Sequence, residues 1–199
     1  HRDLHSFPTR RSSDLPETIT LGDGPAVVDG LSSDQAADLR VEVTDEDGRP
    51  CATSNPLRIA DDASLLHYWG DLHGQSGETV GAGTARDYFA FARDRAFLDI
   101  TGHQGNDFQI DDAFWAEINR LAAEFDDPGR FTAFPSYEWS GNTGMGGDRN
   151  VFYCQQDRPI YRSSSVLLES PHDTDRHHVK DLFESLADEE AFVIAHVGG

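Results

Sequence analysis

Segments with the pattern of β-strands alternate with segments with the pattern of α-helices from residue 65 onward. Apolar residues recur at helical spacing in residues 84–96, 111–125 and 179–186. Short apolar runs without that spacing, which we interpret as strands, occupy residues 97–101, 131–134, 150–153 and 191–195. Such alternation is typical of parallel sheets whose strands are joined by crossover helices. The sequence therefore predicts an α/β fold, in which functional side chains gather at the carboxyl ends of the strands.

The preceding segment, residues 16–62, has few helix signals and many turn residues. Polar and apolar residues alternate at 38–44, a turn follows at 45–48, and another short strand is expected at 56–59. We interpret residues 16–62 as the end of a β-rich, sandwich-like N-terminal domain. Residues 63–199 are then the N-terminal part of the α/β domain, which we expect to be truncated at its C-terminus because the chain stops just after a strand-like run.

Residues 1–15, HRDLHSFPTRRSSDL, are rich in Arg and Ser and have no apolar period, unlike the two segments that follow. This stretch is identified as a translated sequencing adapter, because back-translation in one frame matches a common short-read adapter over the whole length. Such scars are excluded from fold reasoning, so we expect residues 1–15 not to be native and the natural N-terminus to be missing. A disordered natural tail is the alternative interpretation.

Acidic residues outnumber basic ones, 36 to 16, and the formal net charge is −20 at pH 7. A protein that grips nucleic acid needs a basic stripe, and the Lys and Arg residues form no such cluster in the sequence. The sequence also lacks an apolar run of about 18 residues, which a membrane span requires. We therefore expect neither a nucleic-acid partner nor a membrane-spanning segment, and the sequence predicts neither the compartment nor the oligomeric state.

Side chains of metal-ligand type stand at the ends of four predicted strands. Asp71 and His73 end the first strand, His103 follows the second, Glu138 follows the third, and His196 ends the last. A single histidine at a strand end is usually a hydrogen-bonded structural group, but four strands that deliver such groups to one rim favour a metal site. Imidazole and carboxylate ligands suit Zn, Mn or Fe, which can generate hydroxide at neutral pH.

Two residues near His73 have alternative interpretations. Asp71 is either a metal ligand or a carboxylate that orients His73 from the second coordination shell. Gln75 offers a neutral oxygen and is a candidate contact for water or substrate.

Four further residues lie in loops that can approach the same rim. Asp148 could complete the metal set and Arg149 could clamp an anionic group, although a local ion pair explains both equally well. Asn106 and Asp107 follow His103 and are either substrate contacts or turn residues.

Five ordered motifs resemble the domain-of-unknown-function family 3604, a divergent member of the PHP-type superfamily of metal-dependent phosphoesterases, named for polymerase and histidinol phosphatase domains. They are GDLHGQS at 70–76, GHQGND at 102–107, YEWSG at 137–141, GDRN at 147–150 and IAHVG at 194–198. The resemblance implies a fragment of a distorted (β/α)7 PHP-like barrel after the end of the small β-rich domain. It also implies a site for up to three divalent ions, with His73, His103, Glu138 and His196 in ligand positions.

The chain departs from the superfamily pattern at three ligand positions. Gln75 replaces a histidine, Gly102 replaces an aspartate, and Asp148 replaces another histidine. Each change removes or alters one ligand, so we expect one or two divalent ions rather than three.

The resemblance and the ligand set together predict a metal-dependent hydrolase, in which metal-activated water attacks a phosphoester or another anionic ester. Glu138, His103 and Arg149 are the predicted catalytic residues, and the predicted partner is a small anionic substrate. The superfamily's final Asp-x-His motif would lie beyond the chain, so we expect this fragment alone to be inactive. The alternative is a non-catalytic or single-metal ligand-binding protein with a degenerate site.

Overall fold

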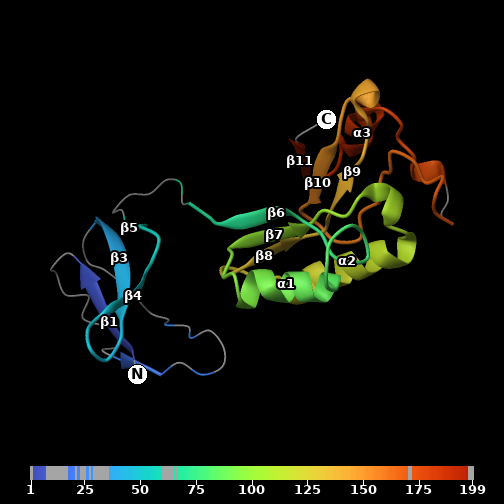
Figure 1. The fold of residues 1–199 in the computed structure, drawn as a ribbon. Coiled ribbons are helices and arrows are strands. Elements are labelled where there is room, and N and C mark those ends of the chain that lie inside the picture. Colours follow the sequence, from blue (N-terminus) through green and yellow to red (C-terminus); the bar gives the residue numbers. More distant parts are fainter. Residues whose placement is uncertain are drawn as a thin grey trace. The chain divides into compact units, whose positions relative to one another are not determined.

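The computed structural model describes residues 2–7, 18–20, 22, 26, 28, 36–59, 65, 67–169 and 172–196. The chain divides into two compact units, His1–His67 and Tyr68–Gly199. Each unit has its own sheets, and every predicted site residue lies in the second one (Figure 1). No helix in these described ranges has the length and apolar character needed to cross a bilayer.

The described part of the first unit is an antiparallel β-structure. Strand β3 pairs on one edge with β1 and on the other with both β4 and β5, and β2 pairs with β1. Between β3 and β4, the Oδ1 atom of Asp45 accepts hydrogen bonds from the backbone N–H groups of Asp47 and Arg49, which stabilises the turn. The strands are β1 (Arg2–Phe7), β2 (Thr18–Ile19), β3 (Ala37–Thr44), β4 (Pro50–Thr53) and β5 (Leu57–Ile59).

Strand β1 lies within the segment attributed to a sequencing adapter. Its pairing with β3 does not test where that sequence came from, and residues 8–15 lie outside the described residues. The attribution therefore stays a prediction.

The second unit begins with the strand–helix alternation expected from the sequence. Thr84 and Asp87 form a capping box at the start of α1, and Asp111 caps α2 by accepting a hydrogen bond from the N–H of Phe114. The three strands are parallel in the order β6-β7-β8, with α1 and α2 along one side of the sheet (Figure 1). The elements are β6 (Gly70–Gly74), α1 (Ala85–Asp94), β7 (Ile100–His103), α2 (Asp112–Phe125) and β8 (Thr132–Phe134).

The second half of the unit is antiparallel. Its strands have the order β11-β10-β9, and α3 precedes β11 in the chain. Short 3-10 helices occupy Asp107–Gln109, Thr143–Met145 and His172–Thr174. The main elements are β9 (Ser136–Trp139), β10 (Arg149–Tyr153), α3 (Val179–Leu186) and β11 (Ala191–Ala195).

The prediction of a (β/α)7 barrel fragment is wrong. The described residues contain three short α-helices and several small sheets, and these sheets do not close into a barrel. Strand β9 follows β8 with only Pro135 between them, so no helix separates these strands. The glycine-rich loop 140–148 is too short for the crossover that a parallel connection needs, and β10 therefore returns antiparallel to β9.

Side chains alternate between two faces along the continuous stretch of β8 and β9. Ala133, Tyr137 and Trp139 are buried against residues of the helices. Ser136 and Glu138 therefore face the opposite side, which we call the site face. The register of the antiparallel sheet places Phe152 opposite Ser136 and Asn150 opposite Glu138 on that same face. The helical core thus fixes which residues reach the site face.

Gly102 on β7 lies close to the side chains of Ser136 and Phe152 on the site face. A Cβ atom added there would lie 2.4 Å from Ser136 Oγ and 3.0 Å from the Phe152 ring. A larger residue at position 102 would therefore have to displace the side chains of Ser136 and Phe152.

We predict that Gly102→Ala lowers the free energy of unfolding by about 1–3 kcal/mol, because it overpacks the contact between β7 and Ser136. Urea denaturation of both proteins measures this difference. The matched control is Gly22→Ala, since a Cβ at Gly22 meets nothing within 4 Å. Equal stability of Gly102→Ala and the wild type would contradict the packing that the structure shows.

Candidate metal centre

Glu138 is a buried carboxylate on the site face. Only 5% of its side chain is exposed. Burial raises the pKa of Glu138, the imidazoles of His196 and His73 lower it, and the carboxylate of Asp148 raises it. The charged form of Glu138 is therefore costly at this position unless positive charge or hydrogen-bond donors lie next to it.

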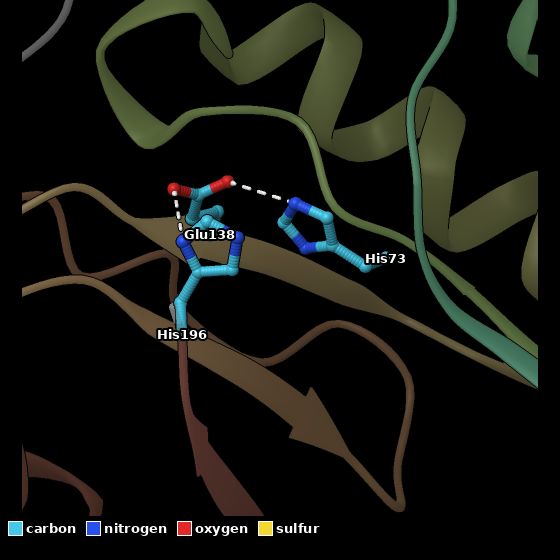
Figure 2. Close-up of side chains that lie close together, drawn as sticks. All are labelled: His73, Glu138 and His196. Carbon is cyan, nitrogen blue, oxygen red and sulfur yellow. Dashed lines mark ion pairs between the residues drawn. The ribbon is translucent and has the colours of Figure 1, made fainter. Parts of the chain in front are cut away.

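Two imidazoles meet this carboxylate from two other strands. His73 Nε2 lies 3.8 Å from Glu138 Oε2, and His196 Nδ1 lies 3.6 Å from Glu138 Oε1. The two rings are stacked, with centroids 4.2 Å apart and an interplanar angle of 25°. Figure 2 shows each ring directed toward a different oxygen of Glu138. One potential ligand atom from each residue lies within 4.8 Å of the other two.

The strand ladders position both histidines. The Oδ1 atom of Asp71 accepts a hydrogen bond of 3.0 Å from the backbone N–H of His73 and so fixes the end of β6. The backbone N–H of His196 donates to the carbonyl of Asp148 at 3.1 Å, which continues the pairing of β10 with β11 by one step. Asp148 also places its Oδ2 atom 3.8 Å from His196 Nδ1.

The residues of this cluster fit a divalent metal ion. His196 Nδ1 is buried and has no hydrogen-bond partner in the described part of the chain, although buried polar atoms are rarely left unpaired. Two ligand atoms that each lie about 2.0–2.1 Å from a tetrahedral zinc are about 3.3–3.4 Å apart, so the spacings of 3.8 and 3.6 Å from the two imidazoles to Glu138 need only a small contraction. Two histidines and one glutamate are also a donor set that catalytic zinc sites use.

His103 is not part of this cluster. It is fully buried, its Nε2 lies 2.8 Å from Ser76 Oγ, and its Nδ1 accepts a hydrogen bond of 3.2 Å from the N–H of Gly105. Because Nδ1 is an acceptor, Nε2 carries the proton and donates to Ser76. The ring packs edge-on against Tyr88 and Phe114, on the helical side of β7. Both nitrogens are thus used within the protein.

Gln75 and Asn106 form a hydrogen-bonded link beside the cluster. Gln75 Nε2 donates to Asn106 Oδ1 at 3.3 Å, and Asn106 Nδ2 donates to Ser140 Oγ at 3.0 Å. Gln75 Oε1 accepts a hydrogen bond of 2.8 Å from Thr79. These bonds join the ends of β6, β7 and β9, so the two amides support the rim of the site.

Asp107 and Arg149 have hydrogen-bond partners within the protein. Asp107 is buried and accepts hydrogen bonds from the backbone N–H and the hydroxyl of Ser163. Burial raises the pKa of Asp107 to about 7, against the lowering effect of those bonds. Arg149 donates to the carbonyl of Asp148 at 2.6 Å and pairs in register with Trp139, whose side chain belongs to the helical core rather than to the site face.

The structure adds two serines that the sequence interpretation did not single out. Ser76 is fully buried and holds His103, and Ser140 bonds Asn106. The available signal was local spacing, because Ser140 follows Glu138 by two residues and therefore continues the same face of the strand.

Comparison with known proteins identifies the family. The family described as "Protein of unknown function (DUF3604)" matches residues 51–198. The chain belongs to this family. The match with DUF3604 includes all three residues of the cluster, His73, Glu138 and His196.

One relative of this DUF3604 chain is an uncharacterized protein of Chlamydia pneumoniae. It is 20% identical over 146 residues, which cover 72% of this chain and 23% of the relative. The chain therefore spans less than a quarter of that relative's length. No solved structure matches the chain.

The buried position of His103 predicts a pH-dependent stability. Burial lowers the pKa of the His103 imidazole from 6.5 to about 4, and the nearby Glu78 carboxylate partly opposes this. Between these two pH values the unfolded chain binds a proton that the folded chain does not. The contribution of neutral His103 is therefore present above about pH 6.5 and lost toward pH 4, by at most about 1.4 kcal/mol per pH unit.

Urea denaturation of the wild type and His103→Gln at several pH values measures this effect. We expect a shallower loss of stability in the variant as the pH falls from 6.5 to 4. Identical slopes would show that His103 does not titrate in this way.

Proposed function

We propose that this chain carries the metal centre of a PHP-type metal-dependent hydrolase that acts on a phosphoester or another anionic ester. The observation that supports the proposal most strongly is the convergence of His73, Glu138 and His196 from three strands. The Nδ1 atom of His196 adds to it, because this atom forms no hydrogen bond within the described part of the chain and is therefore available to a metal ion. The resemblance of the five motifs to family 3604, and through it to the PHP-type superfamily, is the reason for proposing hydrolysis as the reaction.

The residues have distinct roles in this proposal. His73 and His196 hold the ion through neutral imidazole nitrogens, and Glu138 contributes the charged oxygen. A divalent ion bound here would polarise an ester and lower the pKa of a coordinated water. The side chain of His73 is 41% exposed whereas that of Glu138 is 5% exposed, so the centre is open to solvent on the His73 side. A small anionic substrate can approach from that side.

Asp148 is the remaining candidate ligand. Its carboxylate lies 3.8 Å from His196 Nδ1, near enough to bind a shared ion or to orient the ring. His103 and Arg149 are left out of the proposed chemistry, since His103 faces the helices and Arg149 bonds the backbone of Asp148.

The geometry supports one ion at this centre, with Asp148 as the residue that could serve a second. Gln75, which replaces a histidine of the superfamily pattern, uses its amide in bonds to Asn106 and Thr79. This use of Gln75 also favours the second candidate function, a single-metal binding protein without catalysis. Metal binding is common to both functions, and turnover separates them.

The first test is metal binding. Calorimetric titration of the metal-free chain with zinc is expected to show one tight site, and His196→Ala should weaken it by about 100-fold or more because one of three ligands is lost. His178→Ala is the matched control, since His178 is exposed and makes no side-chain cap bond at the start of α3. Equal zinc affinity in the wild type and His196→Ala would refute the metal centre.

The second test is turnover, and it needs a longer DUF3604 protein because the chain covers only part of its relative. We expect the metal-loaded protein to hydrolyse 4-nitrophenyl phosphate faster than the matching sulfate and acetate esters. Replacing the glutamate that corresponds to Glu138 by glutamine should lower that rate by about 100-fold or more. Zinc binding without turnover of any of the three esters would favour the binding protein instead.

A further inference from the structure

Gln104 has a buried side-chain amide that forms no hydrogen bond within the described part of the chain. It follows β7 directly and has no exposed surface. Neither its Oε1 nor its Nε2 atom has a hydrogen-bond partner among the described residues. Each unpaired polar atom costs about 1–3 kcal/mol in a folded protein. A residue with two such atoms next to a candidate site therefore calls for a functional explanation.

The strand register directs Gln104 to the site face. Gly102 pairs with Phe134 on β8, and the pairing keeps the same offset at Asn106, which pairs with Glu138. Gln104 stands midway between these two pairs and so lies beside Ser136. A Cβ at Gly102 would point at Ser136 Oγ, and Gln104, two residues further along, shares that direction.

Asn150 meets the same face from β10. It lies directly opposite Glu138 in the antiparallel register and is 6% exposed. Its Oδ1 atom also lacks a hydrogen-bond partner in the described ranges. Two buried amides, from β7 and β10, thus flank the strand that carries Glu138.

The free atoms of these amides define what they can bind. Gln104 Oε1 and Asn150 Oδ1 are acceptors, the nitrogens of the same two amides are donors, and the carboxylate of Glu138 lies on the same face. A second anionic group would be repelled by this carboxylate. A hydroxyl group, which both donates and accepts, matches the set.

We propose that Gln104 and Asn150 form a subsite for the hydroxyl groups of a polyhydroxylated substrate, next to the metal centre. The inference rests on the proposed function, because it assumes that the anionic ester group of the same substrate binds at the metal centre. It assigns the substrate class as a hydroxyl-rich ester, such as a sugar phosphate, rather than a simple alkyl ester. When such a substrate binds, the amide atoms of Gln104 and Asn150 would form hydrogen bonds to its hydroxyl groups.

The test compares two ligands that share a phosphate monoester. The zinc-loaded chain is titrated calorimetrically with ribose 5-phosphate, which carries hydroxyls, and with propyl phosphate, which carries none beyond its phosphate. We expect ribose 5-phosphate to bind about tenfold more tightly, from two or three added hydrogen bonds. Gln104→Met and Asn150→Leu should reduce this ratio below about threefold and leave the affinity for propyl phosphate unchanged.

Gln155→Met is the control variant, because Gln155 is exposed and bonds Glu190 away from the site face. It should keep the wild-type ratio. Thermal unfolding gives a second readout, since Gln104→Met removes two unpaired polar atoms and should raise the melting temperature of the metal-free chain. A lower melting temperature with correct folding would show that Gln104 has structural partners, and it would overturn the inference.

The outcomes separate the inference from the function on which it rests. Equal binding of the two phosphates to the wild type would overturn the hydroxyl subsite and leave the metal centre and the anionic-ester proposal in place. Loss of both affinities to the same extent in Gln104→Met would also overturn it. Zinc binding with no affinity for either phosphate would reject the substrate class together with the subsite.

Discussion

The alternation of side chains along β8 and β9 is the constraint on which the rest of the second unit depends. Tyr137 and Trp139 are fully buried in the helical core, and Glu138 stands between them. A shift of one residue would send the two large aromatic rings to the site face and the carboxylate into the core. The packing energy of the aromatic residues therefore holds Glu138 in position, because Tyr137 and Trp139 can both enter the core only when Glu138 faces the opposite side.

A cost accompanies this arrangement, since the site face collects polar groups that the fold does not satisfy. Glu138 is buried with two imidazoles and a second carboxylate as neighbours, and His196 Nδ1 has no hydrogen-bond partner among the described residues. Gln104 and Asn150 contribute further unpaired atoms. A sequence selected for stability alone would replace such groups by apolar side chains, so their presence together supports the proposal that this face binds a polar ligand.

Sequence reasoning located the strands, the helices and the polar residues at the strand ends, because each depends on local spacing. Helix α2 (Asp112–Phe125) lies almost where its apolar stripe predicts. The barrel prediction was wrong because local spacing does not reveal whether β9 and β10 are joined by a crossover. Both strands have the same local pattern in either direction, and only the short loop between them decides.

The two residues at the end of β7 show a second limit. The sequence places His103 and Gln104 side by side, and a histidine is the stronger metal-ligand candidate. Which of them faces Glu138 depends on the phase of β7, and the phase is set by the contact of Gly102 with Ser136 and of His103 with the helices. Those contacts join residues far apart in the chain, so local spacing does not reveal them. The structure turns Gln104 to the site face and His103 away from it.

In the proposed function, His73, Glu138 and His196 together bind one divalent ion. X-ray absorption spectroscopy of the chain loaded with one equivalent of zinc reports the ligands of that ion. We expect a first shell of nitrogen and oxygen at about 2.0–2.1 Å with the outer-shell scattering of two imidazoles. A shell that contains sulfur from the exposed Cys51 or Cys154, or one without imidazole scattering, would refute this metal centre.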